Sequence, residues 1–433
     1  MSDVLIDLGD ARSGGRVPDP EPPARARVLL AVLTGVLTAL LGGAAYARPP
    51  EPPVIVPAGL GDAMRVSGDR LYVVGAGQPV GARVREQTIR TYLLPGVTPL
   101  ARNTIRVSGN VQSVVSAGAD RMLVTYQDEG TATFSTVALR AGVDRPLWQR
   151  PAALIGVRAD AGLALVRQEA AEFPDADWHG VDLETGAVRW TVHQPAGDDV
   201  AVGDSAGGYP ERLFVLTAGA RLKVYETRSG RLLAQTPVPE RRAGVTTALW
   251  PAGDLVLLSA GAAGTTGYDA AAGLAPRWHN GMNLSWYRGP TACGDLICAY
   301  LPQRGILVID PRTGRERWAS DRWEYSARVG DYLLVGWPDV AEPQLVVVRA
   351  DTGDVLGSAG VWRAAGPGPA PGTAYVIRSV IGEDRVWYGV LDPARRRVEL
   401  LGTAARVTGD CAIVPRALVC RRIDATVGVW RLG

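Results

Sequence analysis

From residue 58 onward the chain alternates short apolar runs with polar turns. The runs are rich in Val, Leu, Ile and Tyr, and clusters of Gly, Asp and Pro separate them. This alternation is typical of β-strands joined by tight turns, and helical periodicity is almost absent. The pattern predicts an all-β domain over residues 58–433.

One type of turn recurs directly before an apolar strand. It is a Gly-Asp pair, found at Gly68-Asp69, Gly253-Asp254, Gly294-Asp295, Gly330-Asp331 and Gly409-Asp410, with the variant Ala119-Asp120. The 341 residues from Asp69 to Asp410 divide into eight intervals of about 42 residues. Such a period indicates a repeat architecture.

A second turn, Asp-x-x-Thr-Gly with Trp four residues after the Gly, has the same period. The two full copies consist of Asp182, Thr185, Gly186 and Trp190, and of Asp310, Thr313, Gly314 and Trp318. Incomplete copies centre on Ser229-Gly230, Asp269 to Gly273 and Thr352-Gly353. Successive turn glycines (186, 230, 273, 314 and 353) are 44, 43, 41 and 39 residues apart. Two independent turn signals with one period predict a repeated structural unit.

The residue types of the second turn explain its shape. The Asp carboxylate can accept backbone N–H groups two residues on, and Gly supplies a positive φ. We expect the Trp to pack its flat face against the neighbouring repeat. A unit of about 40–45 residues holds roughly four strands, which is the size of a propeller blade.

These turns resemble the tryptophan-docking repeats of the pyrroloquinoline-quinone-like (PQQ-like) β-propellers. The resemblance implies eight four-stranded blades over residues 58–433, with seven as the alternative. Nine turn positions could also mean a ring closed by strands from both chain ends. The family includes quinoprotein dehydrogenases and a non-enzymatic outer-membrane assembly lipoprotein, so the resemblance does not by itself separate an enzyme from a binding protein.

Quinoprotein enzymes of that family place an adjacent Cys-Cys pair beside the quinone, and Glu and Asn hold a Ca²⁺ near a catalytic Asp. This chain has no adjacent cysteines and no segment that matches the calcium site. We therefore assign no catalytic, cofactor-binding or metal-binding residue, and we expect neither PQQ nor calcium. The motif Asp175-Ala176-Asp177-Trp178-His179 contains possible ligands but no metal-site spacing, and we interpret it as a polar loop.

The N-terminal region predicts export. Residues 28–47 (Val28 to Ala47) carry no charge and are long enough to span a bilayer as a helix. Four arginines precede this segment, so residues 1–27 are expected to form a disordered cytoplasmic tail. Residues 48–57 contain five prolines and should form a stiff spacer. A signal peptide cleaved after Ala47 is the alternative, and it also implies export.

The four cysteines fit an exported protein with two disulfides. A two-residue loop at Asp295-Leu296 would place Cys293 opposite Cys298 in a hairpin. A loop at Pro415-Arg416 would do the same for Cys411 and Cys420. We predict the pairs 293–298 and 411–420, since zinc ligation would need nearby histidines.

Composition narrows the function classes. The 46 basic and 44 acidic residues give a net charge of +2, which argues against a nucleic-acid binder. Lys223 is the one lysine, a bias typical of high-GC bacteria such as actinobacteria. We expect a membrane-anchored, extracytoplasmic, non-catalytic scaffold that binds another envelope protein or a cell-wall polymer. The alternatives are a quinone-dependent dehydrogenase or another propeller enzyme, and a sensor that signals through the tail.

Overall fold

The computed structural model describes residues 52–432, except 170–174, 204, 207, 241–246, 302–304 and 337–343. The tail, the segment from Val28 to Ala47 and the start of the spacer lie outside the described residues. Within the described part, no helix is long and apolar enough to cross a membrane. The described chain is almost entirely β-structure, as the alternating pattern predicted.

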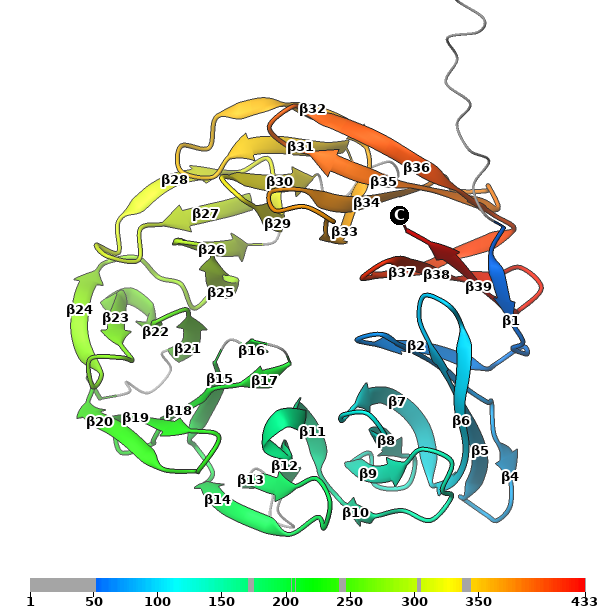
Figure 1. Ribbon diagram of the computed structural model, residues 1–433. Coiled ribbons are helices and arrows are strands. Elements are labelled where there is room, and N and C mark those ends of the chain that lie inside the picture. The colour runs from blue at the N-terminus through cyan, green and yellow to red at the C-terminus, as the bar shows by residue number, and fades with distance from the viewer. Residues whose placement is uncertain are drawn as a thin grey trace, which may run out of the picture. The chain divides into compact units, whose positions relative to one another are not determined.

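The strands form four-stranded antiparallel sheets arranged in a ring (Figure 1), and we number these blades in chain order from β2. Blade 1 contains β2 (Ala63–Ser67), β3 (Arg70–Val74), β5 (Arg85–Leu93) and β6 (Thr98–Val107), with the short β4 (Gln78–Pro79) paired to β5. Blade 2 contains β7 (Gly109–Ser116), β8 (Arg121–Asp128), β9 (Phe134–Arg140) and β10 (Trp148–Arg150). Blade 3 contains β11 (Ala153–Arg158), η1 (Ala159–Ala161), β12 (Leu163–Glu169), β13 (Ala176–Asp182) and β14 (Val188–Gln194).

The next three blades follow the same order. Blade 4 contains β15 (Asp199–Val202), β18 (Arg212–Leu216), β19 (Arg221–Glu226) and β20 (Leu232–Pro237), with a small hairpin of β16 (Ser205–Ala206) and β17 (Tyr209–Pro210). Blade 5 contains β21 (Thr247–Ala252), β22 (Leu255–Ala260), η2 (Gly261–Ala263), β23 (Thr265–Asp269) and β24 (Ala275–Asn280). Blade 6 contains β25 (Arg288–Cys293), β26 (Leu296–Leu301), β27 (Gly305–Ile309) and β28 (Glu316–Ser320).

The last three blades complete the ring. Blade 7 contains β29 (Glu324–Val329), β30 (Tyr332–Gly336), β31 (Gln344–Arg349) and β32 (Val355–Val361). Blade 8 contains β33 (Arg363–Pro367), β34 (Ala374–Ser379), β35 (Arg385–Asp392) and β36 (Arg397–Ala405). Blade 9 contains β37 (Val407–Val414), β38 (Ala417–Arg422), β39 (Val427–Arg431) and, from the other chain end, β1 (Val54–Val56).

The described residues thus form a nine-bladed propeller, so the prediction of eight blades, or seven, was wrong. At about 42 residues per repeat, residues 58–433 have room for nine blades. The prediction had instead divided this segment by eight, the number of blades usual in the family. The segment Val54–Val56 was assigned to the spacer, but it pairs with β39 as the outermost strand of blade 9. Both chain ends therefore close the ring.

The packing between the sheets also indicates nine blades. Each of the nine hydrophobic clusters lies between two consecutive blades. In β3, for example, Leu71 and Val73 pack toward blade 9, whereas Tyr72 and Val74 pack toward blade 2. Successive strand residues point to opposite faces of a sheet, so one apolar strand serves two junctions. This explains why the strands are continuously apolar.

Both predicted cysteine pairs lie at disulfide-bonding distance, with Cα atoms 5.8 Å apart for Cys293–Cys298 and 4.1 Å apart for Cys411–Cys420. The second pair is directly opposite in its hairpin, as predicted. The first pair is diagonal, because Cys293 pairs with Leu296 and the loop is Gly294-Asp295. Gly294 has φ +73° and occupies the first position of the loop. The predicted loop had placed Asp295 at that position.

Candidate protein-binding face

The two recurring turns lie on the same face of the ring. In blades 1, 2, 5, 6 and 7 the innermost strand turns into the second through the Gly-Asp type of turn or its Ala-Asp variant. In blades 3 to 7 the third strand turns into the outermost through the Asp-x-x-Thr-Gly type or an incomplete copy of it. Because consecutive strands are antiparallel, both connections emerge on one side, which we call the turn face. Gly409-Asp410 is an exception, since it lies in an irregular part of β37 and the turn of blade 9 is at Pro415-Arg416.

Each full copy of the second turn is organised by its Asp. The Asp182 Oδ1 atom accepts the backbone N–H groups of Glu184 and Thr185, both at 2.9 Å, and Gly186 has φ +69°. Asp310 accepts the N–H of Arg312 at 2.8 Å in the same way, and Gly314 has φ +68°. These carboxylates hold a turn, which accounts for them without catalysis.

An arginine that the sequence analysis missed completes the turn. In blades 3, 5 and 6 a β-bulge at the start of the outermost strand falls on Arg189, Arg277 and Arg317. Arg189 donates to Asp182 Oδ2 at 2.5 Å and Arg317 donates to Asp310 Oδ2 at 2.8 Å. Arg277 ion-pairs with Asp269 in the same way. The signal was an Arg directly before the Trp in all three blades.

These ion pairs hold the carboxylates in their charged form. The hydrogen bond from Arg189, followed by the turn N–H groups, lowers the pKa of Asp182 to about 2. Burial raises the pKa of Asp310, but the N–H of Arg312 and the charge of Arg317 outweigh it, and the net pKa is lowered. The carboxylates of Asp182 and Asp310 therefore stay ionised and paired with their arginines at neutral pH.

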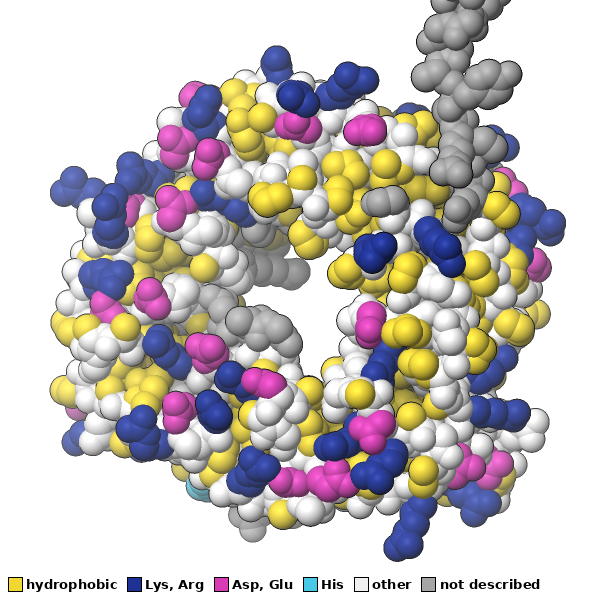
Figure 2. Space-filling view, viewed as in Figure 1, with side chains coloured by type: hydrophobic (Ala, Val, Ile, Leu, Met, Phe, Trp, Pro, Cys, Tyr) yellow, Lys and Arg dark blue, Asp and Glu magenta, His cyan; other side chains and the backbone are white. Residues whose placement is uncertain are grey.

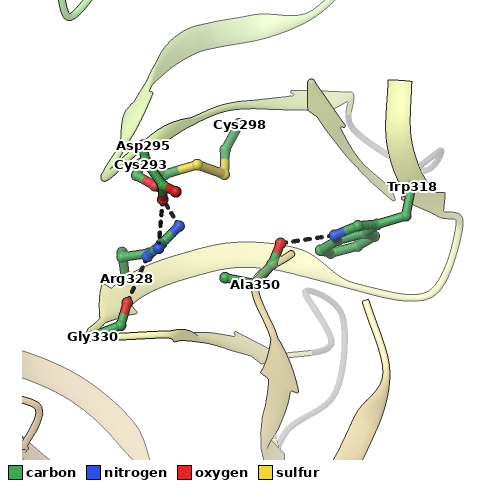
Figure 3. The surroundings of a disulfide bond; sticks show 7 residues. All are labelled: Cys293, Asp295, Cys298, Trp318, Arg328, Gly330 and Ala350. Atoms are coloured by element: carbon green, nitrogen blue, oxygen red, sulfur yellow. Dashed lines mark hydrogen bonds and ion pairs between the residues drawn. A yellow bond between two sulfur atoms is a disulfide. The ribbon is translucent and has the colours of Figure 1, made fainter. Parts of the chain in front are cut away.

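The residue after the bulge is the Trp, which reaches the next blade. The Trp318 indole N–H donates to the Ala350 carbonyl of blade 7 at 2.9 Å, as Figure 3 shows. A Cβ on Gly353 would lie 2.6 Å from the same ring. Trp278 docks on Pro311 and Gly314 of blade 6 in the same manner. The equivalent contacts of Trp148 and Trp190 are with Gly186 and Gly230.

Beside the first disulfide, an arginine ties blades 6 and 7 (Figure 3). Arg328 of β29 donates to the Cys293 carbonyl at 2.8 Å and to the Asp295 carboxylate at 2.7 Å. Its third bond, to the Gly330 carbonyl, is 2.7 Å long. The disulfide hairpin of blade 6 is thereby attached to the turn of blade 7.

A charged cleft of about 490 Å³ opens on the turn face between blades 5 and 6. Its acidic lining residues are Asp254, Asp295 and Asp310, and its basic ones are Arg277, Arg312 and Arg317. Arg277, Arg317 and Asp310 are engaged in the turns. The side chain of Arg312, in contrast, is 80% exposed, and its Nε lies 3.8 Å from Asp310. The cleft thus offers exposed charges of both signs on a rigid wall.

Figure 2 shows the centre of the ring as an open hole, with acidic and basic side chains distributed around it. No group of three or more His, Cys, Asp or Glu able to hold a metal occurs in the described part of the chain. All four cysteines are in the two hairpin pairs. The absence of PQQ and calcium stays a prediction.

The histidines are held by neighbouring side chains in the sheets. The segment around His179 is strand β13 and not the polar loop that the sequence suggested. His179 is buried with Nδ1 at 3.0 Å from Thr191 Oγ1, and burial lowers its pKa. The Nδ1 atom of His193 lies 2.8 Å from Asp177 Oδ1, a hydrogen bond that raises the pKa of His193. Pairing between neighbouring strands explains both residues.

A family model described as "Outer membrane protein assembly factor BamB" matches residues 98–320, slightly more than half of the chain. The match covers the turns of blades 2 to 6, including both full Asp-x-x-Thr-Gly copies. A comparison with curated proteins found no match.

Several solved propeller structures align with the chain at low identity. BamB from Moraxella catarrhalis is 11% identical, with 88% of this chain and 97% of that chain covered and a TM-score of 0.43. The computationally designed protein Ika8 is 13% identical, with coverages of 76% and 99% and a TM-score of 0.45. Sqt1 of Chaetomium thermophilum, bound there to the N-terminus of a ribosomal protein, is 10% identical, with coverages of 88% and 100% and a TM-score of 0.44. None of these likenesses is close enough to assign a function.

Proposed function

The chain belongs to the family of the outer membrane protein assembly factor BamB, and on this premise we propose that it is a non-catalytic binding scaffold. The scaffold would be held at the outer surface of the cell membrane by the uncharged segment from Val28 to Ala47. Its partner would be another envelope protein or a cell-wall polymer, bound on the turn face. The near-neutral net charge argues against nucleic acid as the partner.

The charged cleft between blades 5 and 6 carries this proposal. Its walls are rigid because Asp310 and Arg317 are fixed in the turn and Trp278 docks beneath them. Arg312, Asp254 and Asp295 add exposed charges of both signs at its mouth. Exposed charges of both signs are suited to a polar partner with complementary charge, where they raise specificity and association rate.

Site-specific photocrosslinking in intact cells tests the proposal. A photoreactive amino acid at Arg312, in the full chain, should give one reproducible adduct. The same label at Arg395, which is 83% exposed and lies in the equivalent turn of blade 8, is the matched control and should not give it. Equal labelling at both positions, or none at Arg312, would contradict a binding site in the cleft.

The captured partner then permits a direct measurement. Binding of the purified partner to the full chain should weaken at least tenfold with Arg312→Glu, and it should weaken with added salt because the contacts are charged. An unchanged affinity would remove the cleft from the interface. Oxidation of a dye by the purified protein after addition of PQQ and Ca²⁺, with a bound chromophore, would instead support the quinoprotein alternative.

The anchor requires its own experiment. Mass spectrometry of the protein extracted from membranes should show an N-terminus upstream of Val28. A mature protein that starts at Arg48 would contradict the anchor and support the cleaved signal peptide.

A further inference from the structure

The connection between the first two strands of blade 8 differs from the short Gly-Asp turns. In blades 1, 5, 6 and 7 this connection has two residues, whereas six residues, 368–373, join β33 to β34. They continue a Gly- and Pro-rich run that begins at Gly366. Loops that a rigid scaffold positions frequently carry binding sites.

The loop of blade 8 is held in one shape by its own contacts. The N–H of Gly368 donates to the Thr373 carbonyl at 3.0 Å, and the Thr373 hydroxyl donates to the Ala370 carbonyl at 2.6 Å. A side chain at Gly368 would overlap the Thr373 hydroxyl, so this closure needs glycine. Pro367 and Pro369 restrict the backbone further, because each proline fixes its φ. The loop is therefore a preformed wall.

This loop and the neighbouring turn of blade 9 line a cavity of about 340 Å³. The innermost strands of the two blades, β33 and β37, are neighbours in the ring (Figure 1). Both connections lie on the turn face, because each joins the first strand of a blade to the second. The described lining residues are Gly366, Pro367, Gly368, Pro369 and Tyr375 of blade 8 and Ile413, Val414, Pro415 and Arg416 of blade 9.

Most of the lining is apolar. Pro367, Pro369 and Pro415 are exposed, and Ile413 and Val414 are half-buried. The volume is at the lower end of the range for ligand pockets, so the cavity suits one compact group. Apolar walls favour an apolar group, because its burial removes apolar surface from water.

The cavity also contains a buried hydroxyl. Tyr375 is 5% exposed, and its hydroxyl makes no hydrogen bond to any residue that the structure describes. Burial raises the pKa of this phenol, so it stays a neutral hydrogen-bond donor. Buried tyrosines usually find a hydrogen-bond partner, and an acceptor on a ligand would supply one here.

A positive charge completes the lining. Arg416 is exposed, and it is the one charged residue among the described residues that line the cavity. Its guanidinium makes no ion pair or hydrogen bond within the described part of the chain. A guanidinium in this state is suited to a carboxylate, with which it forms charge-assisted hydrogen bonds.

We propose that this cavity binds a small carboxylic acid with a branched apolar body. The apolar body lies against the prolines and Ile413, the carboxylate pairs with Arg416, and the Tyr375 hydroxyl donates to an oxygen of the ligand. A short-chain acid in solution and the C-terminal residue of a peptide both present this chemistry. The site is separate from the charged cleft between blades 5 and 6, so each can fail without the other.

Two probes test the site, N-acetyl-leucine as a chain end and 4-methylpentanoate as a short-chain acid. Each is titrated against the full chain in detergent and followed by saturation-transfer NMR, with micelles alone as the blank. We expect saturable binding of at least one acid with a dissociation constant on the order of 1 mM, since few atoms contribute. The acid that binds more tightly identifies the source of the ligand. No saturable binding of either acid would overturn the proposal.

The uncharged amides of the two probes test the role of charge. They should bind more weakly by about fivefold or more, because they cannot form an ion pair with Arg416. Equal binding of acid and amide would contradict the proposal. Tyr375→Phe keeps the ring in place and should weaken binding of the acid by about twofold to tenfold, through the loss of one hydrogen bond.

Arg416→Gln should abolish the preference for acid over amide, and Arg406→Gln is its matched control. Arg406 is also exposed and has φ +59°, close to the +69° of Arg416, but it lies between β36 and β37, on the face opposite the turn face. The control should bind like the wild type. A preference that survives Arg416→Gln, or that Arg406→Gln removes equally, would contradict the site. Thermal unfolding of each variant separates loss of the site from loss of the fold.

Discussion

Two adjacent junctions of the ring lie between blades 4 and 5 and between blades 5 and 6. Each is filled by a large side chain, but one side chain comes from the preceding blade and the other from the following blade. At the 5–6 junction, Trp278 of blade 5 extends forward onto the turn of blade 6 and is 8% exposed. At the 4–5 junction, the corresponding position of blade 4 is Ala234. Here the turn of blade 5 sends Leu274 backward into the junction, where it is 1% exposed among blade 4 residues.

The difference can be followed to the turn glycines. A Cβ on Gly314 would lie 2.4 Å from the Trp278 ring, whereas a Cβ on Gly273 would meet nothing within 4 Å. Both glycines have φ +68°. Blade 5 also has one additional turn residue, Leu274, which adopts φ +65° at a position normally reserved for glycine. Each junction buries one large side chain, but that side chain comes from a different blade in each case.

Removing the filling side chain should have the largest effect. We expect Trp278→Ala to lower the free energy of unfolding by about 3–5 kcal/mol and Leu274→Ala by about 2–4 kcal/mol, since each leaves a cavity between blades. Chemical denaturation measures both. Trp286→Ala is the control, because this Trp is 72% exposed and its loss should cost less than about 0.5 kcal/mol. A Leu274→Ala effect as small as that of the control would break the comparison.

The two glycines separate backbone strain from docking. Gly273→Ala should cost about 1 kcal/mol for the positive φ alone. Gly314→Ala should cost about 2–4 kcal/mol, because the added Cβ also clashes with the docked Trp278. In a Trp278→Ala background the two glycine substitutions should cost the same, which a double-mutant cycle by thermal unfolding would test. Additive effects would show that the indole is not the cause.

The polar tie between blades 6 and 7 should have an intermediate effect. Arg328→Gln removes donors to two backbone carbonyls and a carboxylate, and we expect a loss of about 1–2 kcal/mol in chemical denaturation. Arg312→Gln, at an exposed arginine on the same face, should change stability by less than about 0.5 kcal/mol. Equal values for the two variants would mean that Trp318 alone holds this junction.

The ion pair between Asp182 and Arg189 should contribute the least to the free energy of unfolding. Its contribution should also depend on pH. The folded-state pKa of Asp182, about 2, is below its ordinary value of 3.8, so its contribution is complete above pH 4 and is lost as pH falls toward 2. We expect about 1 kcal/mol after allowance for solvent screening. Asp182→Asn and Arg189→Gln should each flatten the dependence of unfolding midpoint on pH between 4 and 2. An unchanged slope in both variants would contradict the assignment.

Much of the fold could be predicted from local signals. The period of about 42 residues predicted the propeller, because each blade needs its own turns at fixed spacing. The cysteine pairs were predictable because both partners lie within one hairpin. The register at Cys293 was not, since it depended on Gly294 taking the first loop position.

The bulge and its arginine could have been found from the repeated Arg-Trp pairs, but their roles could not. An ion pair between Arg317 and Asp310 requires knowing that an extra residue interrupts the pairing of β28 with β27. Pairing irregularities leave no composition signal. The charged cleft likewise joins turns from two blades whose contact is set by packing.

The sequence alone determined the repeating unit, the all-β class and the short-range turns, because these depend on residues a few positions apart. The tertiary structure decided how many units close the ring, since closure depends on Val54–Val56 meeting β39 more than 370 residues later. It also decided that Trp278 fills one junction while Leu274 fills another, because each choice depends on the volume that the neighbouring blade leaves. Local chemistry defined the blades, and the packing between neighbours defined the ring.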